Sequence, residues 1–375
     1  MSGSAYDVVV VGLGGVGSAA AAELAARGHR VLGLDRHAAV HDQGASHGET
    51  RIVRKAYFEG AGYVPLLLRS YDLWRSLGLL TVTGGLFLGE QGSRVLEGSR
   101  ATAVAHGLDH DVLSAGEVTR RFPAMTPPPG TVALHEADAG VVSPEAAVSA
   151  QLTRAAAAGA ELHHLEPVLS WRAGRQGVRL RTPAGSYEAG AMVLAPGRWT
   201  PELLGDLALP LVVEPRVMHW FDPPAGAGAF APDRFPVWIW ERPDGTTPYG
   251  VPGVAGRAGG VKAAVHFSPV RPPADWTPEQ LGGLLAPLLP GLGSTVVRSA
   301  DCTYTLTPDE DFVVGRHPAH EQVVLACGFS GHGFKFTPVL GEVLADLAVD
   351  GSTAYDLSGL SPQRFAATQV QGAGR

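Results

Sequence analysis

The hydrophobic pattern of the first 35 residues predicts two strands with a helix between them. Residues 6–11 (YDVVVV) form a short, continuous apolar run, which is typical of a buried strand. After three closely spaced glycines, residues 18–27 are alanine-rich and are followed by Gly28, which is typical of a helix and its end. A second apolar run at residues 29–34 ends at Asp35. The chain therefore opens as strand, helix and strand.

The three glycines fit a phosphate-binding turn. Gly12, Gly14 and Gly17 form the pattern GxGxxG between the first strand and the helix, and Asp35 follows 18 positions after Gly17. In this context the glycines let backbone amides approach a pyrophosphate at the helix N-terminus, and the acidic residue accepts ribose hydroxyls. A tight turn without a ligand is the alternative. The pattern indicates a dinucleotide site but does not separate FAD from NAD.

Two kinds of segment follow the opening unit. The pattern predicts a helix from Ser143 to Gly159, short strands over 161–188 and an apolar strand at 191–195. This last strand ends in the turn Pro-Gly-Arg-Trp, which contains Gly197 and looks like a return to the nucleotide-binding sheet.

The remaining segments favour a second, different sheet. Residues 86–140 and 216–300 are richer in proline, tryptophan and β-branched residues, as expected of antiparallel strands. The tail from residue 361 is expected to be a loose end. The fold class we expect is α/β for the nucleotide-binding part and α+β for the chain overall.

Composition restricts the class of partner. The 375 residues are 45% hydrophobic and 17% charged, and 29 basic against 36 acidic residues give a net charge of −7 without a basic run. This balance argues against a nucleic acid or an anionic membrane and favours a small ligand. No apolar run reaches the roughly 18 residues of a membrane span. Cys302 and Cys327 are too few for a disulfide framework, so we expect a cytoplasmic protein.

Lysine is rare in this chain, with Lys55, Lys262 and Lys335 as the only three among 29 basic residues. An ammonium group is compact and can lose its proton, and a planar guanidinium cannot replace it in that chemistry. A chain that otherwise uses arginine is expected to keep lysine where this chemistry is needed, although chance retention is the alternative.

Two segments carry charged groups in a pattern that could form a site. In SHGETRIVRKAY, Arg51 and Arg54 are three residues apart and share a face if the segment is helical, where they would attract an anion. The segment GGVKAAVHFSP is typical of a strand with Lys262, Ala264 and His266 on one face, which suggests a pocket wall. Surface charges and an ordinary strand histidine are the alternatives.

Two further segments lie near the C-terminus. Cys302 and Tyr304 are two positions apart in a predicted strand and should project to the same side. Residues 328–336 (GFSGHGFKF) form a glycine-rich loop before a helix that starts at Thr337, and its N-terminus favours partial negative charge. An inert buried thiol and a simple tight turn are the alternatives.

Taken in order, these segments resemble the monomeric sarcosine oxidase family, which includes N-methyltryptophan oxidase and belongs to the D-amino-acid-oxidase type of flavoenzymes. The resemblance rests on the opening fingerprint, SHGETRIVRKAY with the following YVPL, GGVKAAVHF, CTYTLTPDEDF and ACGFSGHGFKF. It runs from residue 6 to about residue 347, and the last two motifs are specific to the family.

The resemblance implies particular roles. Cys302 matches the cysteine that bonds to the 8α-methyl group of the flavin, so the implied cofactor is FAD held covalently. Lys262 matches the lysine near flavin N5 that promotes reaction with oxygen. Arg54 and Lys335 match the pair that binds the substrate carboxylate.

Other positions match residues around the flavin ring and the substrate amine. Arg51 and His47 correspond to residues close to the ring, and His266, Tyr249 and Tyr304 to residues around the amine. The catalytic residues implied are Lys262, His266, Arg51 and Tyr304. The cofactor-binding residues expected are Gly12, Gly14, Gly17, Asp35, His47, Thr50, Arg51, Gly197, Cys302, Gly328, Gly331, Gly333 and Lys335.

One position of the expected substrate pocket departs from the family pattern. Ile239 stands where sarcosine oxidases carry a methionine, and Trp238 and Trp240 flank it. We expect all three to bind the substrate side chain or N-substituent. No metal site is expected.

The resemblance implies a Rossmann-like FAD-binding domain and a smaller antiparallel-sheet substrate domain. We expect the first to comprise residues 1–85, 141–215 and 300–375 and the second residues 86–140 and 216–299. We expect a monomer.

The implied activity is oxidation of a secondary (N-methyl) α-amino acid by oxygen, which gives an imine, then an aldehyde and a primary amine, and hydrogen peroxide. Alternatives are an oxidase or dehydrogenase of another amine, such as glycine, a D-amino acid, proline, pipecolate or a sugar-amine adduct. A catalytically silent flavin-binding subunit is a further alternative. An NAD-dependent dehydrogenase is disfavoured because nothing after Asp35 resembles a nicotinamide site.

Overall fold

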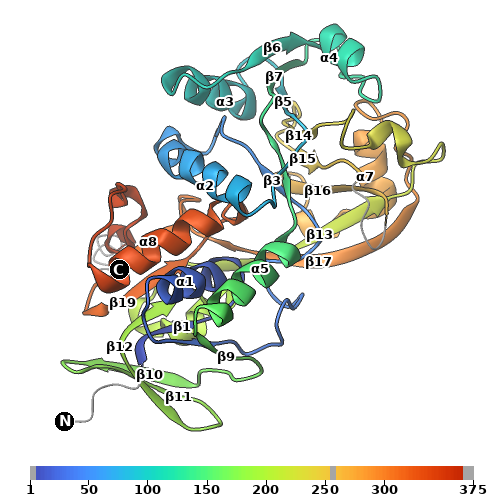
Figure 1. The fold of residues 1–375 in the computed structure, drawn as a ribbon. Coiled ribbons are helices and arrows are strands. Elements are labelled where there is room, and N and C mark those ends of the chain that lie inside the picture. Colours follow the sequence, from blue (N-terminus) through green and yellow to red (C-terminus); the bar gives the residue numbers. More distant parts are fainter. Residues whose placement is uncertain (1–5, 254–258, 366–375) are drawn as a thin grey trace, which may run out of the picture. The chain divides into compact units, whose positions relative to one another are not determined.

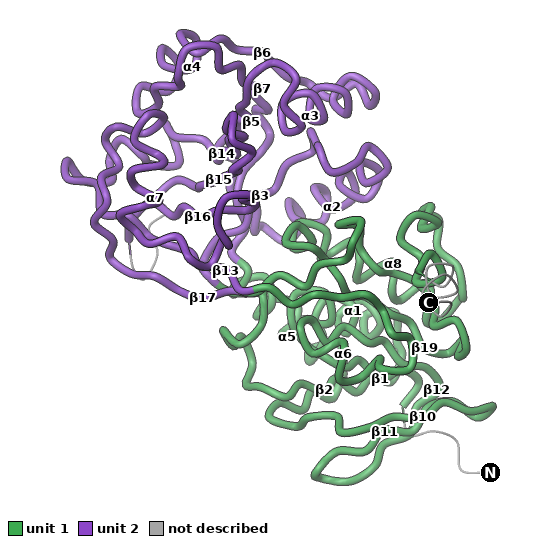
Figure 2. The backbone as a smooth tube through the Cα atoms, turned by 180° about the vertical axis from the view of Figure 1, so that it is seen from behind, with its two compact units in different colours: residues 1–47, 144–214, 303–375 green, residues 48–143, 215–302 purple. Residues whose placement is uncertain are grey.

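The computed structural model describes residues 6–253 and 259–365 and divides into two compact units (Figure 2). Unit 1 comprises residues 1–47, 144–214 and 303–375, and unit 2 comprises residues 48–143 and 215–302. Each unit has its own sheet and its own buried core, so each is described separately.

Unit 1 is a layered α/β unit whose described residues include an eight-stranded sheet. Its main path runs β10-β11-β12-β1-β2-β9, and β19 pairs with β12 and with β18. The strands are β1 (Tyr6–Val11), β2 (Val31–Leu34), β9 (Glu161–His163), β10 (Ser170–Gly174), β11 (Gly177–Arg181), β12 (Ser186–Leu194), β18 (Val313–His317) and β19 (His320–Cys327).

The centre of this sheet is parallel. β1 pairs in parallel with β2 and with β12, and β12 pairs in parallel with β19. Helix α1 (Gly15–Ala26) lies between α5 (Pro144–Ala157) and α8 (Thr337–Val349), as Figure 1 shows, and α1 also contacts β1, β2 and β12. The predicted first strand, helix and second strand are confirmed, and so is the return of the strand before Gly197 to the nucleotide-binding sheet.

Unit 2 contains an eight-stranded sheet among its described residues, in the order β17-β13-β16-β15-β14-β5-β7-β6. A small sheet, β3-β8-β4, accompanies it. The strands are β3 (Arg51–Val53), β4 (Thr81–Val82), β5 (Gly85–Gly89), β6 (Asp111–Ser114), β7 (Val132–Glu136), β8 (Gly140–Val142), β13 (Val212–Phe221), β14 (Val237–Trp240), β15 (Thr247–Gly250), β16 (Val261–Phe267) and β17 (Val296–Leu306).

The helices of unit 2 are α2 (Val64–Ser76), α3 (Arg94–Ala105), α4 (Ala115–Arg121) and α7 (Pro278–Leu285) within its described residues. The short helix α6 (Thr200–Leu203) belongs to unit 1. The 3-10 turns are η1 (Ala61–Tyr63), η2 (Gly197–Trp199), η3 (Gly205–Leu207), η4 (Ala227–Phe230), η5 (Pro273–Asp275), η6 (Phe334–Phe336), η7 (Ser358–Leu360) and η8 (Pro362–Phe365).

The large sheet of unit 2 has two distinct faces because side chains alternate along each strand. One face packs Phe221, Val261 and Trp238 against the leucines of α7 and against Val118 of α4. The other face carries a cluster of Met218, Trp220, Ala264 and Cys302 with Tyr249 beside it, and a second cluster around Phe87 and Ile239. Lys262 lies on the same face as these two clusters, and we call this whole face of the sheet the polar face.

The α/β fold class is confirmed, but two boundaries are wrong. Residues 48–85 belong to unit 2 and not to the nucleotide-binding unit, because β3 and β4 pair with β8 and β5 lies in the large sheet. The tail does not become loose at residue 361, because Phe365 of η8 packs on Val313 and Cys327. Residues 366–375 lie outside the described residues, and so does 254–258.

The described residues contain no helix that is both long enough and apolar enough to cross a membrane.

Candidate functional site

A cavity in unit 1 lies where the sequence predicts the dinucleotide. Its walls come from the end of β1, the glycine turn, the end of β2 and the turn after β12. The predicted cofactor residues Gly12, Gly14, Asp35 and Gly197 line it. Other lining residues lie outside the glycine fingerprint, among them Arg36, His41, Ser46, His164, Glu166 and Trp199.

The glycine turn is shaped for close backbone approach. A Cβ atom on Gly17 would lie 1.7 Å from the carbonyl oxygen of Gly12, so only glycine allows α1 to start this close to β1. A Cβ atom on Gly14 would meet only Ser46 Oγ, at 3.6 Å, so that backbone faces open space. The amide of Gly15 donates to Ser46 Oγ at the first turn of α1. This arrangement fits a pyrophosphate at the helix N-terminus.

Asp35 is oriented by backbone amides at the rim of this cavity. Its carboxylate accepts hydrogen bonds from Leu13 N (2.7 Å) and from His37 N (2.8 Å), and the side chain is buried. His41 Nε2 lies 3.6 Å from the same carboxylate. Burial lowers the pKa of His41, although the charge of Asp35 opposes that shift. The rings of His37, His41 and Trp199 lie beside one another, which suits an aromatic base.

Glu166 supplies a second fixed carboxylate on the cavity wall. It accepts hydrogen bonds from the hydroxyl groups of Thr182 and Tyr187, and His163 Nδ1 lies 2.8 Å away. Burial raises the pKa of Glu166, but these three hydrogen bonds outweigh it and the net pKa is lowered. Burial raises the pKa of Tyr187 to about 12, and the hydrogen bond to Glu166 acts in the same direction. Glu166 is therefore held ionised at the cavity.

Lys262 lies on the polar face of unit 2 with its ammonium held by two backbone carbonyls. Nζ donates to Gly48 O (2.9 Å) and to Thr50 O (2.6 Å), and only 2% of the residue is exposed. Tyr249 and Met218 are the cross-strand partners of Ala264, which stands two positions after Lys262 on β16. The predicted common face of Lys262 and Ala264 is confirmed by this register, and half-buried His266 follows two positions further along β16.

Ile239 joins this face, but the neighbouring tryptophans do not. Ile239 is the cross-strand partner of Tyr249 and packs with Phe87. Trp238 and Trp240 point to the opposite side of β14, where they pack in the core with α7. Our placement of both tryptophans beside Ile239 is wrong, because successive side chains of a strand alternate between faces.

Arg51 and Cys302 also meet in unit 2. Arg51 Nη2 lies 4.0 Å from Cys302 Sγ, and its Nη1 donates to Thr50 O at 2.8 Å. The Cys302 thiol is therefore a buried group in contact with a guanidinium. The other cysteine, Cys327, is fully buried, and burial raises its pKa to about 12, so it is a packed, unreactive thiol.

Arg54 does not share a helical face with Arg51, which the sequence had suggested as a possibility. Residues 51–53 form strand β3 and not a helix, so the spacing of three does not put Arg51 and Arg54 on one face. Arg54 is buried, with its Nη2 2.5 Å from both carboxylate oxygens of Glu59. Its guanidinium also lies against the rings of Tyr57 and Phe58. Sequence reasoning missed Glu59, although it is a charged residue only five positions away.

A buried carboxylate fixes the backbone next to Arg54. Glu136 accepts hydrogen bonds from Lys55 N (2.9 Å) and Ala56 N (2.9 Å), and its pKa is raised by burial. Lys55, one of the three lysines, uses its ammonium in an ion pair with Asp138 at 2.8 Å. The ammonium group of Lys55 is therefore used in an ion pair within unit 2.

The remaining predicted residues belong to unit 1. Lys335 is buried in η6, immediately before α8, and its Nζ donates to His332 O at 2.7 Å. Residues 303–306, the end of β17, belong to unit 1, and the ring of Tyr304 there lies directly against Gly331, since a Cβ atom on Gly331 would be 2.2 Å from it. His47 is buried at the end of the first segment of unit 1. Gly328 and Gly333 lie in the same loop as Gly331.

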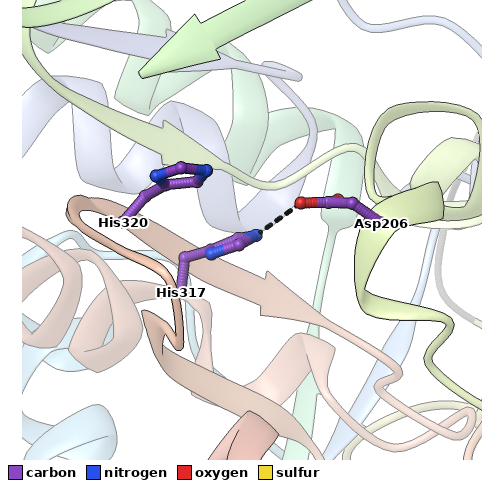
Figure 3. Close-up of side chains that lie close together, drawn as sticks. All are labelled: Asp206, His317 and His320. Carbon is purple, nitrogen blue, oxygen red and sulfur yellow. Dashed lines mark hydrogen bonds and ion pairs between the residues drawn. The ribbon is translucent and has the colours of Figure 1, made fainter. Parts of the chain in front are cut away.

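A separate cluster of Asp206, His317 and His320 lies in unit 1, with its ligating atoms within 4.8 Å of one another (Figure 3). His317 Nδ1 accepts a hydrogen bond from the amide of Ala319, which leaves the ring hydrogen on Nε2, 3.1 Å from Asp206. A metal at Nε2 would displace that hydrogen and move it to Nδ1, against the Ala319 amide. We therefore assign this cluster to hydrogen bonding.

Comparison with known proteins identifies the family. Residues 7–347 match the family model described as DAO, FAD dependent oxidoreductase. The chain belongs to this family. It is an FAD-dependent oxidoreductase, and the cavity of unit 1 with its glycine turn and Asp35 fits the dinucleotide part of FAD.

Curated relatives match over nearly the whole chain. The chain is 46% identical to monomeric sarcosine oxidase of Streptomyces avermitilis, covering 96% of this chain and 98% of the relative. It is 34% identical to N-methyl-L-tryptophan oxidase of Salmonella typhimurium, covering 96% and 99%.

Solved structures agree with the fold. NikD, described as an unusual amino acid oxidase essential for nikkomycin biosynthesis, superimposes with a TM-score of 0.81 at 30% identity, covering 95% of this chain and 97% of NikD. The L-proline dehydrogenase of P. horikoshii superimposes with a TM-score of 0.83 at 22% identity, covering 98% and 99%, and shows the fold alone.

Proposed function

We propose that the protein oxidises a secondary, N-methyl α-amino acid with oxygen as electron acceptor. The observation that carries this proposal is the buried Lys262 ammonium on the polar face of unit 2, the face that also carries Tyr249 and Ile239. The full-length similarity to monomeric sarcosine oxidase and to N-methyl-L-tryptophan oxidase supports the substrate class.

When bound, FAD would supply the acceptor for a hydride, which is one proton and two electrons, from the C–H bond next to the substrate nitrogen, and oxygen would finally take up two electrons and two protons as hydrogen peroxide. In the net reaction, a secondary amine, oxygen and water give a primary amine, an aldehyde and hydrogen peroxide. The protein supplies charge and position. Lys262 places a positive charge where oxygen gains its first electron and becomes an anion, and a fixed cation lowers the energy of that charge separation.

We also propose that Arg54 contributes to binding of the substrate carboxylate. Arg54 is not an open cation, because Glu59 already pairs with it. Substrate binding would therefore require the incoming carboxylate to replace Glu59 or to share the guanidinium with it. Exchange of one carboxylate for another leaves the buried charge of Arg54 compensated at every stage.

We also propose that Cys302 joins the flavin covalently. The support is its position 4.0 Å from the Arg51 guanidinium, on the same face of unit 2 as Met218 and Trp220. We further propose a cytoplasmic, monomeric enzyme that releases hydrogen peroxide.

Oxidation of a different amino acid is the second candidate. It is favoured by the similarity to NikD and by Ile239, which stands where sarcosine oxidases carry a methionine. A change of one apolar side chain on the polar face alters the space available to an N-substituent.

A peroxide assay in air separates these functions. The panel comprises sarcosine, N-methyl-L-tryptophan, other N-methyl amino acids, glycine, D-alanine, proline, pipecolate and a sugar-amine adduct. We expect the highest kcat/KM with an N-methyl amino acid. Peroxide formation from glycine or proline alone would favour the second candidate, and flavin that no substrate reduces would favour a silent subunit.

A further inference from the structure

The two carbonyl groups that hold Lys262 come from a single tight turn, Gly48-Glu49-Thr50, which we call the 48–50 turn. Gly48 and Glu49 both have left-handed backbone angles, with φ of 91° and 66°. The amide of Thr50 donates back to Gly48 O at 2.7 Å. Glycine adopts this conformation readily, but glutamate does so only where its surroundings hold it.

One wall of the turn is fixed by close packing. A Cβ atom on Gly48 would lie 2.7 Å from Met218 Cε, so the backbone of the turn rests directly on β13. Thr50 O also accepts from Arg51 Nη1, the guanidinium that reaches Cys302. The 48–50 turn therefore connects the acceptors of Lys262 with the group beside the thiol.

The other side of the turn is held by an ion pair that has no role in the proposed reaction. Glu49 Oε1 lies 2.9 Å from Arg298 Nη2, and the Arg298 guanidinium lies 3.9 Å from the centre of the Trp220 ring. Trp220 is the cross-strand partner of Lys262, whose Nζ is 5.6 Å from the centre of the same ring. Both cations therefore lie against one indole, and Glu49 pairs with the Arg298 cation.

We propose that the Glu49–Arg298 ion pair is a positioning device for Lys262. It holds Glu49 in its left-handed conformation and keeps the carbonyls of Gly48 and Thr50 directed at the ammonium. It thereby sets the rate at which reduced enzyme reacts with oxygen. This inference rests on the oxygen role given to Lys262 under the proposed function.

The ion pair differs from an ordinary surface contact. Arg298 is about one-third exposed and Glu49 one-fifth exposed, and the arginine is stacked on a buried ring. Stacking keeps a guanidinium in place with little loss of freedom on pairing, whereas lysine has only a flexible stem and a point charge. Arginine at position 298 therefore suits a fixed anchor for Glu49.

The test measures the two half-reactions of the holoenzyme separately. The bound flavin is reduced with light and an electron donor in the absence of oxygen, so no substrate needs to be known. The reduced enzyme is then mixed with oxygen, which takes up two electrons and two protons as hydrogen peroxide, and the rate constant is measured by flavin absorbance. We expect Arg298→Met and Glu49→Gln each to lower it roughly tenfold.

Two variants serve as comparisons. Arg298→Lys keeps the charge and should recover part of the rate, while Arg121→Met, which breaks an exposed ion pair with Asp111 in the same unit, should leave the rate within about twofold of wild type. Anaerobic reduction by an active substrate should change by less than about threefold in the Arg298 and Glu49 variants. The double variant should be no slower with oxygen than either single variant.

The decisive arm repeats Arg298→Met in a Lys262→Met background. If the ion pair acts through Lys262, the second substitution has no further effect on reoxidation. If Arg298→Met slows reoxidation equally in both backgrounds, the positioning role is overturned. It is also overturned if Arg298→Met reacts with oxygen at the wild-type rate while Lys262→Met reacts slowly. If Lys262→Met itself reacts with oxygen at the wild-type rate, the oxygen role of Lys262 fails and this inference falls with it, whereas the choice of amine substrate is unaffected.

Discussion

At the scale of single residues, the neighbours of a buried group decide what that group can do. The two cysteines show this most clearly. Cys302 lies 4.0 Å from a guanidinium on the polar face of unit 2, whereas Cys327 is fully enclosed in unit 1 and burial raises its pKa to about 12. The two buried thiols therefore differ in their neighbours: Cys302 contacts the Arg51 guanidinium, whereas Cys327 packs on Val313 and Phe365.

The first prediction concerns this thiol. Acid-precipitated wild-type protein should remain yellow, because a thioether to Cys302 would survive denaturation. Cys302→Ala should release its flavin to the supernatant, and Cys327→Ala should keep it in the pellet. The measurement is flavin absorbance in the two fractions. A colourless wild-type pellet would contradict the covalent bond and leave bound FAD possible.

The second prediction follows from the Arg54–Glu59 pair. Arg54→Ala removes the partner of a buried carboxylate, so it should lower the free energy of unfolding by about 3–5 kcal/mol. The double variant Arg54→Met/Glu59→Gln removes both charges and should be destabilised much less. Denaturant unfolding of the two variants measures the difference.

The same double variant tests the carboxylate contact without the burden of an unpaired charge. We expect its kcat/KM for an amino acid to fall by an amount that corresponds to about 2–4 kcal/mol of lost transition-state stabilisation. Its activity on the matching carboxamide should change little. Equal losses for acid and carboxamide would argue against a carboxylate at Arg54.

At the scale of single elements, β14 shows how alternation assigns neighbouring residues to different tasks. Ile239 contacts Phe87 and pairs with Tyr249 on the polar face, while Trp238 and Trp240 pack in the core beneath α7. A strand of four residues therefore contributes both to a candidate substrate wall and to the core of unit 2.

The third prediction uses this alternation. Ile239→Met should change the ratio of kcat/KM between small and large N-substituents with little effect on stability, since the two side chains have similar volume. Trp240→Ala should lower stability by about 3–5 kcal/mol through the cavity it leaves. A substrate panel and thermal unfolding of each variant measure these effects. A selectivity change from Trp240→Phe with none from Ile239→Met would reverse our assignment of the two faces.

At the scale of the whole molecule, buried titratable groups make stability depend on pH. Burial lowers the pKa of His317, and neighbouring His320 lowers it further, although Asp206 opposes both effects. Below the ordinary histidine pKa the unfolded chain gains a proton at this position before the folded chain does. His317 therefore reduces stability as the pH falls from about 7 toward 5.

The fourth prediction is that His317→Gln reduces this loss. The urea midpoint of the wild type should fall more between pH 7.5 and pH 5.5 than that of the variant, even if the variant is less stable at pH 7.5. His106→Gln, at an exposed position at the end of α3, should behave as wild type. A pH dependence that is the same in the wild type and His317→Gln would contradict the role of His317.

Local sequence pattern was sufficient for the parts of the molecule whose chemistry depends on neighbouring residues. The glycine turn, its flanking strands and Asp35 lie within 30 residues, and their backbone requirements can be read from residue type alone. The alternation on β16 likewise determined that Lys262 and Ala264 share a face, because a strand has a fixed period of two.

Tertiary structure decided the contacts between residues far apart in the chain. The pairing of β3 with β8 made a strand of the segment that we took for a possible helix and moved residues 48–85 to unit 2. The carbonyl groups that hold Lys262, the thiol beside Arg51 and the guanidinium paired with Glu49 each lie more than 200 residues away, so no local pattern reveals these contacts. The sequence by itself determined which side chains could do the chemistry, and the strand pairings determined their counter-charges and faces, because a buried ion or a sheet register is defined only by the groups that folding places around it.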